Sequence, residues 1–312
     1  MSGTPGPVRA KGLRRAIGWV LGLGLLVLAV WYARDGIDLA VLGEASPWLF
    51  GALAGLVVVN LLSTTGLFWS VTRAFDTRPP VGFGTMSALI AVSGVLNFIP
   101  VVRAGLWGRA AYLKKFHGLV VRDSVVILGV VLGLALAVLG TVALVLVVLP
   151  SDVRWWACGA ALAVQAVIGP RVWGKALRRS VPGAWTWVAW RTLDLAAAAG
   201  RLVLAFEVVG YRLTLADAVL LASANLIVKL VGLTPNGLGL SEWVVAALSA
   251  AMMPIEAATA AAAALVDRTV EVLMVLVAGA AGGMWLKREA TQRDGIDSGF
   301  RHADSSPHVD GG

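Results

Sequence analysis

The chain is poor in the residues from which disulfides and metal sites are built. Of its 312 residues, one is a cysteine, Cys158, and three are histidines, His117, His302 and His308. A single cysteine excludes an internal disulfide, and none of the histidines forms a metal-spaced cluster with it. We therefore expect no metal and no cofactor.

Charge is equally scarce. Charged residues make up 14% of the chain, against about 25% in soluble domains, and hydrophobic residues make up 58%. Several apolar runs exceed the roughly 18 residues that a helix needs to cross a bilayer. The sequence therefore predicts an all-α integral membrane protein, a polytopic helical bundle. Its net charge of +8 fits basic cytoplasmic loops and gives no reason to expect a nucleic-acid partner.

The hydrophobic segments define the domain organisation. We expect a basic cytoplasmic N-terminus over residues 1–15, a single transmembrane domain over 16–286 and a disordered cytoplasmic tail over 287–312. The first segment is long and further spans follow it, which favours an uncleaved span over a signal peptide. The segments lie at 16–33, 48–70, 83–99, 121–149, 155–169, 184–207, 217–233, 239–253 and 259–286.

Two of these segments end in helix-breaking residues. The run 83–99 stops at Pro100, and the run 217–233 stops at "TPNGLGLSE", residues 234–242. A broken helix is tolerated at membrane depth only where its backbone is buried in protein or lines a wet cavity. Each break therefore predicts a re-entrant hairpin, and the alternative is a complete span followed by a surface loop.

The basic residues favour the hairpins. With a cytoplasmic N-terminus and two hairpins, only Arg34, Arg154 and Arg212 fall outside, whereas two complete spans would move the basic cluster 171–179 outside as well. We predict six crossings of a bacterial cytoplasmic membrane, with both termini in the cytoplasm.

The same pattern occurs twice, over about 48–149 and about 184–286, each time as a span, a hairpin and a second span. Three crossings separate equivalent elements, and this odd number predicts that the two repeats are inverted in the membrane. Inverted repeats with broken helices are an architecture of transporters.

The first break carries two arginines. A charge at the bilayer centre costs about 2.5–3.5 kcal/mol on insertion scales, so a function or a partner is expected for each of them. One interpretation is that they clamp a lipid phosphate, with a glycine that permits close backbone approach. In the other, Arg103 pairs with an internal carboxylate and Arg109 lies at the interface. The candidate substrate-binding residues here are Asn97, Arg103, Gly105 and Arg109.

The second break adds four more candidates for substrate binding, Asn236, Gly237, Gly239 and Glu242. Ser241 and Glu242 stand where a half-helix begins, and a free helix N-terminus attracts anions. Glu242 is either a capping charge at that N-terminus or the counter-ion of Arg103 when no substrate is bound.

Further charges lie inside the predicted spans. Charged residues in spans face the bundle interior and pair with one another, so we expect an internal charge network, with a direct role in substrate or proton movement as the alternative. Arg191, Asp194 and Arg201 share one face of a helical wheel, and Asp267 and Glu271 are i,i+4 neighbours beside Arg268. Lys229, six residues before Pro235, is the seventh member.

These motifs resemble the flippase-like family that contains the lysylphosphatidylglycerol synthase transmembrane region. The matching residues of the first motif are Asn97, Pro100, Arg103, Gly105 and Arg109, with Arg103 one position later than in some members, and "TPNGLGLSE" and "ALVDRTVEV" follow in order. The resemblance covers about residues 12–290. It implies translocation of a lipid, and not its synthesis, because the chain has no soluble aminoacyl-transferase domain.

Three classes of function are compatible with these features. The first is a flippase-like transporter that moves an anionic lipid or lipid-linked precursor, with membrane lipids as its partners. The second, an integral-membrane enzyme, lacks support because Glu242 and Asp267 form no catalytic cluster. The third is a non-transporting scaffold for lipid-synthesis or glycosyltransferase enzymes, in which the charges only hold the fold. No recognisable pattern in the sequence encodes the lipid headgroup, the direction or energy source of transport, or the oligomeric state.

Overall fold

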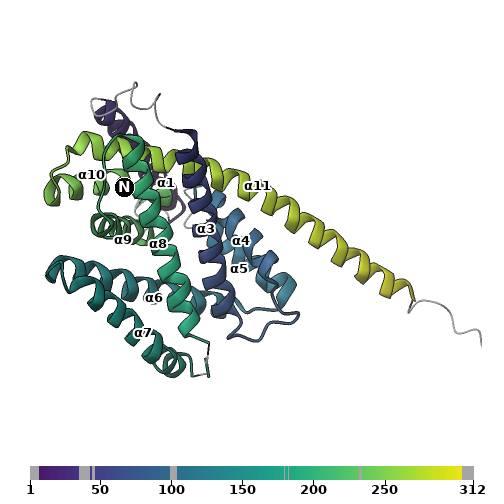
Figure 1. Cartoon of the computed structure of the whole chain (residues 1–312). Helices are drawn as coiled ribbons and strands as arrows, with labels where there is room; N and C mark the ends of the chain where they lie inside the picture. Colours follow the sequence, from purple (N-terminus) through teal and green to yellow (C-terminus); the bar gives the residue numbers. More distant parts are fainter. Residues whose placement is uncertain are drawn as a thin grey trace, which may run out of the picture.

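A computed structural model describes residues 7–34, 43, 46–98, 104–178, 180–181, 183–231 and 234–303, with side chains described over 20–292. The predicted turn residues Pro100 and Arg103 lie outside these ranges. Every regular element within them is helical, as predicted (Figure 1). The elements are α1 (Pro7–Ala33), α3 (Pro47–Thr72), α4 (Phe83–Leu96), α5 (Ala104–His117), α6 (Val121–Val148), α7 (Arg154–Leu177), α8 (Trp185–Val208), α9 (Leu215–Val231), η2 (Pro235–Gly237), α10 (Leu240–Met252) and α11 (Ala257–Ala303).

Two helices, α3 with 26 residues and α6 with 28, are long and apolar enough to cross a membrane. Helix α8 has 24 residues, a comparable length, but it carries Arg191, Asp194 and Arg201 among its apolar residues. These charges are buried, so the helix is polar on the side that faces its neighbours.

Four shorter helices flank the two predicted breaks. Helices α4 and α5 have 14 residues each, and α9 and α10 have 17 and 13. At 1.5 Å per residue each is about 20–25 Å long, less than the roughly 30 Å of a hydrocarbon core. At the second break, Asn236, Gly237 and Gly239 all adopt positive φ, which ends one helix and redirects the chain into the next.

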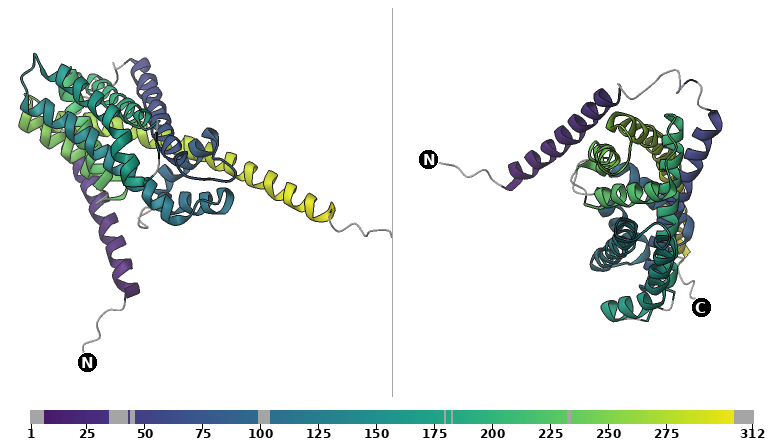
Figure 2. Two further views of the ribbon diagram at one scale, coloured as in Figure 1. Left: turned by 90° about the horizontal axis from the view of Figure 1, so that it is seen from below. Right: turned by 60° about the vertical axis from the view of Figure 1, so that its left-hand side comes forward.

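Helices from the first half of the chain pack against helices from the second half. Helix α3 lies along α8, α11 packs on α4 and α10, and α6 packs on α9 and α7 (Figures 1 and 2). One apolar core joins α8 and α9 around Phe206 and Leu221, and a second joins α3, α4 and α8 around Met86 and Trp187. The bundle interior is thus closed by side chains from both halves of the chain.

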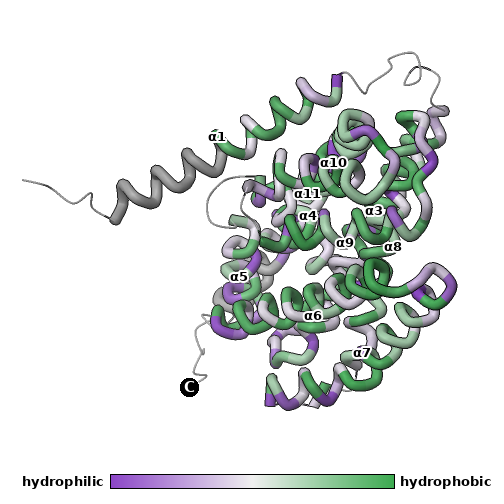
Figure 3. Tube along the Cα trace, turned by 90° about the vertical axis from the view of Figure 1, so that its left-hand side faces the viewer, coloured by the Kyte–Doolittle hydropathy of each residue, from purple (hydrophilic) through white to green (hydrophobic). Residues whose placement is uncertain are grey.

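The outward faces of the bundle are apolar as well. Large hydrophobic side chains on α6 and α7 are exposed, among them Leu144, Val148 and Trp156, the last at 83%. Apolar residues dominate along these helices and hydrophilic residues gather near their ends (Figure 3). Soluble monomers rarely expose contiguous apolar surface of this kind.

Helix α11 departs from the predicted boundaries. A disordered tail is predicted from residue 287, but α11 continues without a break to Ala303 and projects beyond the other helices (Figures 1 and 2). The segment 287–293, Lys-Arg-Glu-Ala-Thr-Gln-Arg, contains mostly good helix formers, and extending an existing helix needs no new nucleus. Residues 304–312 lie outside the described part of the chain.

Gly239 permits the close contact between the second break and α1. Its φ is +76°, and a Cβ added there would meet the side chain of Leu25 and the carbonyl oxygen of Gly22. We therefore expect Gly239→Ala to lower the free energy of unfolding by roughly 1–3 kcal/mol. Thermal unfolding of the purified protein in detergent measures this.

Gly129→Ala is the matched control, because this helical glycine on α6 is exposed and has open space around its Cβ position. It should leave the melting temperature unchanged or raise it slightly, since alanine is the better helix former. Equal melting temperatures for both variants would contradict the strained contact at Gly239.

Candidate functional site

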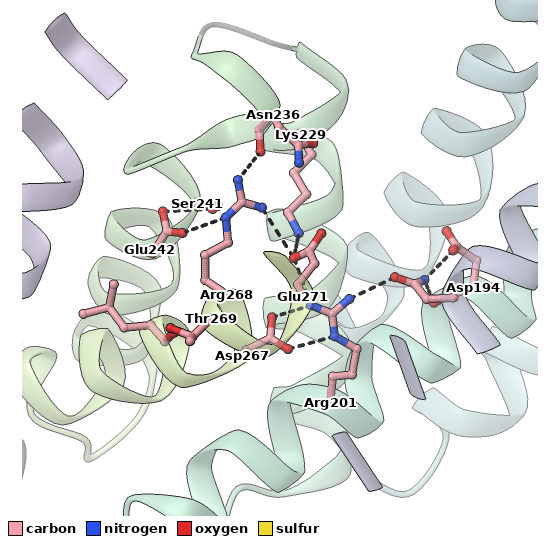
Figure 4. A network of polar contacts seen from close by, with 12 residues as sticks. Asp194, Arg201, Lys229, Asn236, Ser241, Glu242, Asp267, Arg268, Thr269 and Glu271 are labelled. Carbon is pink, nitrogen blue, oxygen red and sulfur yellow. Dashed lines mark hydrogen bonds and ion pairs between the residues drawn. The ribbon is translucent and has the colours of Figure 1, made fainter. Parts of the chain in front are cut away.

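Arg201 on α8 is the most heavily bonded residue of a buried charge network. Its Nε and Nη2 donate to the two carboxylate oxygens of Asp267 at 2.8 Å each, and Nη2 also donates to Glu271 at 2.9 Å. Its Nη1 donates to Oδ1 of Asn60 at 3.0 Å. This guanidinium joins α8, α11 and α3, and 3% of its side chain is exposed (Figure 4).

Glu271 forms ion pairs with three cationic side chains. Its Oε2 lies 2.7 Å from Nζ of Lys229, 2.9 Å from Arg201 and 3.4 Å from Nη1 of Arg268. Glu271 follows Asp267 by four residues and Arg268 by three, so both are its neighbours on the surface of α11.

Asn60 links this cluster to a second one. Its Nδ2 donates to Oδ1 of Asp194, and Thr64 donates to the same oxygen at 3.3 Å. Arg191 forms an ion pair with the other oxygen of Asp194. A continuous polar path therefore runs from Arg191 on α8, through α3, to the residues of α11.

Arg268 lies beside the second break and near Phe98, the last described residue before the first. Its Nη2 donates to the backbone carbonyl of Asn236 at 2.9 Å, and its Nε lies 3.6 Å from Oε1 of Glu242. Its Cζ lies 5.5 Å from the ring of Phe98, which follows α4. The side chain thus lies over the ring of the last described residue before the first break and bonds the turn of the second. Figure 4 shows its contacts with Asn236 and Glu242.

A small cavity lies inside the network. Its volume is about 10 Å³, room for about one water, and its polar lining includes Asn225, Lys229, Ser241, Glu242 and Arg268. The Oδ1 of Asn225, the Oε1 of Glu242 and the Nε of Arg268 have no hydrogen-bond partner within the described part of the chain. A polar space therefore exists between α9, α10 and α11, beside the second break.

The sequence predicted an internal charge network, and all seven proposed members make ion pairs in two groups bridged by Asn60. Sequence reasoning missed Asn60, Thr64 and Asn225. Asn60 offered a signal, because it is a lone amide in the middle of an apolar span. Its role depends on a partner 134 residues away, which no local pattern identifies.

The predicted substrate residues are distributed over three places. Asn236 and Glu242 join the charge network, and Gly237 and Gly239 shape the turn. Arg103 lies outside the described residues, so its predicted approach to Glu242 stays a prediction. Within the described chain, Glu242 faces Arg268 instead, and Ser241 donates to its Oε2 at 3.0 Å.

Asn97 and Gly105 lie at the contact between α4 and α5. A Cβ at Gly105 would collide with the carbonyl oxygen of Ser93 and with Oδ1 of Asn97, and Ser93 donates to the carbonyl of Gly105 at 2.9 Å. Gly105 therefore brings the two short helices together. The close approach that Gly105 permits is therefore between the backbones of α4 and α5.

Arg109 on α5 is separate from the network. It is buried at 8% exposure, with its Cζ 3.8 Å from the centroid of the Phe68 ring, and its depth in the membrane stays a prediction. It lines a second cavity of about 10 Å³ together with Thr72, Leu113 and Ser124. Among the described residues no carboxylate lies within ion-pairing distance of it, so its charge is balanced only by the aromatic face.

The described residues contain no group of three or more His, Cys, Asp or Glu side chains placed to hold a metal ion. Comparison with protein-family models, with curated proteins and with solved structures gives no match. The resemblance to the lysylphosphatidylglycerol synthase transmembrane family therefore stays a prediction that rests on the motifs alone.

Proposed function

We propose that the protein is a flippase-like transporter that moves an anionic lipid or lipid-linked precursor across the bacterial cytoplasmic membrane. The observation that carries this proposal is Arg268, a buried cation that contacts Phe98 at one helix break and the carbonyl of Asn236 at the other. Two interrupted helices that meet in a polar, charged interior are what a substrate path through a bilayer requires.

The anionic specificity is inferred from Arg109. A buried guanidinium without a carboxylate partner is costly in a membrane, and a ligand phosphate would offset that cost. The cavity beside it has mainly apolar walls with the hydroxyl groups of Thr72 and Ser124, and at about 10 Å³ it would have to widen before it admits a phosphate group. Arg103 and the other motif residues contribute to the same site in this proposal.

The helix packing supports the inverted-repeat architecture. In a chain of two related halves, α3 corresponds to α8, the pair α4 and α5 to α9 and α10, and α6 to α11. The contacts follow this exchange, because α11 packs on α4 just as α6 packs on α9, and α3 pairs with α8. The short helices are then two re-entrant hairpins, and both termini are cytoplasmic.

Cysteine labelling tests this topology. In a Cys158→Ala background, single cysteines at Lys114 and Arg178 should react with an impermeant maleimide only from the cytoplasmic side. A cysteine at Arg212 should react only from outside. External labelling of the cysteine at position 178 would remove the hairpins and the inverted repeat together.

A scaffold function has one specific observation in its favour. The network holds four cations, Arg191, Arg201, Lys229 and Arg268, and four carboxylates, so it is neutral without a ligand. Transport of fluorescent phosphatidylglycerol in vesicles containing the purified protein, with phosphatidylcholine as the zwitterionic control, separates the two proposals. If the protein is a scaffold, both lipids should cross the bilayer at the rate measured in protein-free vesicles.

A further inference from the structure

The contact between Glu242 and Arg268 differs from every other ion pair of the described network. The other arginine and lysine side chains donate hydrogen bonds to their carboxylates, for example Arg201 to Asp267 and Lys229 to Glu271, at 2.7–2.9 Å. The nearest nitrogen of Arg268 stands 3.6 Å from Glu242, beyond hydrogen-bond distance. The Oε1 of Glu242 therefore interacts with Arg268 through charge alone, without a hydrogen bond.

Both facing atoms are buried and unpartnered. Glu242 is 1% exposed and Arg268 is 4% exposed, and neither the Oε1 of the one nor the Nε of the other has a hydrogen-bond partner in the described part of the chain. Both line the small cavity of the network. An N–H donor is therefore aimed at a space that holds about one oxygen atom.

The charge balance decides what can enter this space. With Glu242 in place, the four cations and four carboxylates cancel, and an additional anion meets the buried carboxylate directly. With Glu242 withdrawn, one positive charge of the network is unbalanced and a donor of Arg268 is free. An anionic oxygen then gains the ion pair and the hydrogen bond that Glu242 does not make.

Building on the proposed transport function, we propose that Glu242 is an internal stand-in for the substrate, occupying the place beside Arg268 that an oxygen of a phosphate group takes. The chemistry is that of a phosphomonoester or phosphodiester anion. Glu242 and the headgroup compete for Arg268, so Glu242 sets the affinity of the site.

This competition links binding to movement. Glu242 lies in the first turn of α10, and Asn236, whose carbonyl accepts from the same guanidinium, lies in the turn just before it. A headgroup that replaces Glu242 removes a contact between the second break and α11. Binding then favours the conformation in which α10 has separated from Arg268, which is the differential affinity that a transport cycle needs.

Calorimetric titration of the purified protein with dihexanoylphosphatidylglycerol tests the proposal. Glu242→Gln keeps the shape of the side chain and removes the competing charge, so it should bind this soluble lipid roughly tenfold more tightly than the wild type. Glu242→Asp, which keeps the charge but shortens the side chain, should bind with intermediate affinity. Glu256→Gln, an exposed glutamate shortly after α10, is the matched control and should bind as the wild type does.

The gain must depend on Arg268. The double variant Glu242→Gln, Arg268→Gln should lose the gain in affinity for dihexanoylphosphatidylglycerol. Dihexanoylphosphatidylcholine should show no gain in affinity with Glu242→Gln. Inorganic phosphate distinguishes the source of the anion: a gain for phosphate as well as for the lipid indicates recognition of the phosphate group alone. A gain for the lipid only indicates that the acyl chains contribute.

Wild-type affinity in both Glu242→Gln and Glu242→Asp overturns the proposal, and so does a gain that persists without Arg268. If Glu242→Gln does not fold, wild-type affinity in the aspartate variant alone overturns it. Binding is measured without transport, so the two hypotheses fail separately. An affinity gain in a protein that moves no lipid leaves the Glu242 site standing and removes the transport function.

Discussion

Arg201→Met should unfold the protein or lower its free energy of unfolding by about 3–5 kcal/mol, the range measured when one partner of a buried ion pair is removed. Arg201 makes both hydrogen bonds that Asp267 accepts from arginine, and it also bonds Glu271 and Asn60. Without it, the carboxylate of Asp267 stays buried with no hydrogen-bond donor among the described residues. Unfolding in mixed micelles measures the loss.

The double variant Arg201→Met, Asp267→Leu is the informative companion. It removes both charges of the pair, leaves Glu271 with Lys229 and Arg268, and should recover most of the lost stability. Arg212→Met is the matched control because that arginine is exposed in the loop before α9, and it should change stability by less than about 0.5 kcal/mol. A fully stable Arg201→Met would show that the network does not hold α8 to α11.

Arg109→Ala should reduce transport of anionic lipid at least about tenfold while the protein stays folded and inserted, since one good charge-assisted contact accounts for roughly that factor. No carboxylate lies within ion-pairing distance of Arg109 in the described chain, so its removal leaves no orphaned charge. Arg109→Lys should transport at an intermediate rate, because lysine keeps the charge but loses the planar fork that holds two phosphate oxygens.

The same vesicle assay, with fluorescent phosphatidylglycerol and a phosphatidylcholine control, gives the readout. Arg122→Ala, at the exposed start of α6, should transport at the wild-type rate. Two results would refute the site. One is undiminished transport by Arg109→Ala, and the other is loss of that variant from the membrane, which would make Arg109 a structural residue and favour the scaffold function. We expect Arg103→Lys and Arg103→Ala to follow the same order.

The contrast between Arg201 and Arg109 separates the two roles that a buried arginine can take. Arg201 is saturated by carboxylates and an amide, and its loss should appear in stability. Among the described residues Arg109 has only the face of Phe68 as a partner for its charge, and its loss should appear in transport. Arg268 lies between these extremes, with two bonded nitrogens and a third that faces Glu242 at 3.6 Å.

The sequence by itself determined the helical class, the position of the second break and seven of the charged residues of the network. These features are local. Proline and glycine end a helix wherever they occur, as at 234–239, and residues three or four apart share a helix face, as Asp267 and Glu271 do. The end of α11 could not be located from the sequence, because the polar segment 287–293 contains mostly good helix formers that extend an existing helix.

Only the tertiary structure decided which charge meets which. Arg201 and Asp267 are 66 residues apart, Asn60 and Asp194 are 134 apart, and Glu242 faces Arg268 across the contact between α10 and α11. The wheel positions of these residues allow many pairings, and each has a similar Coulomb energy when considered alone. Helix packing selects among them, because the contacts of α3 with α8 and of α11 with α4 and α10 determine which side chains lie within reach of one another.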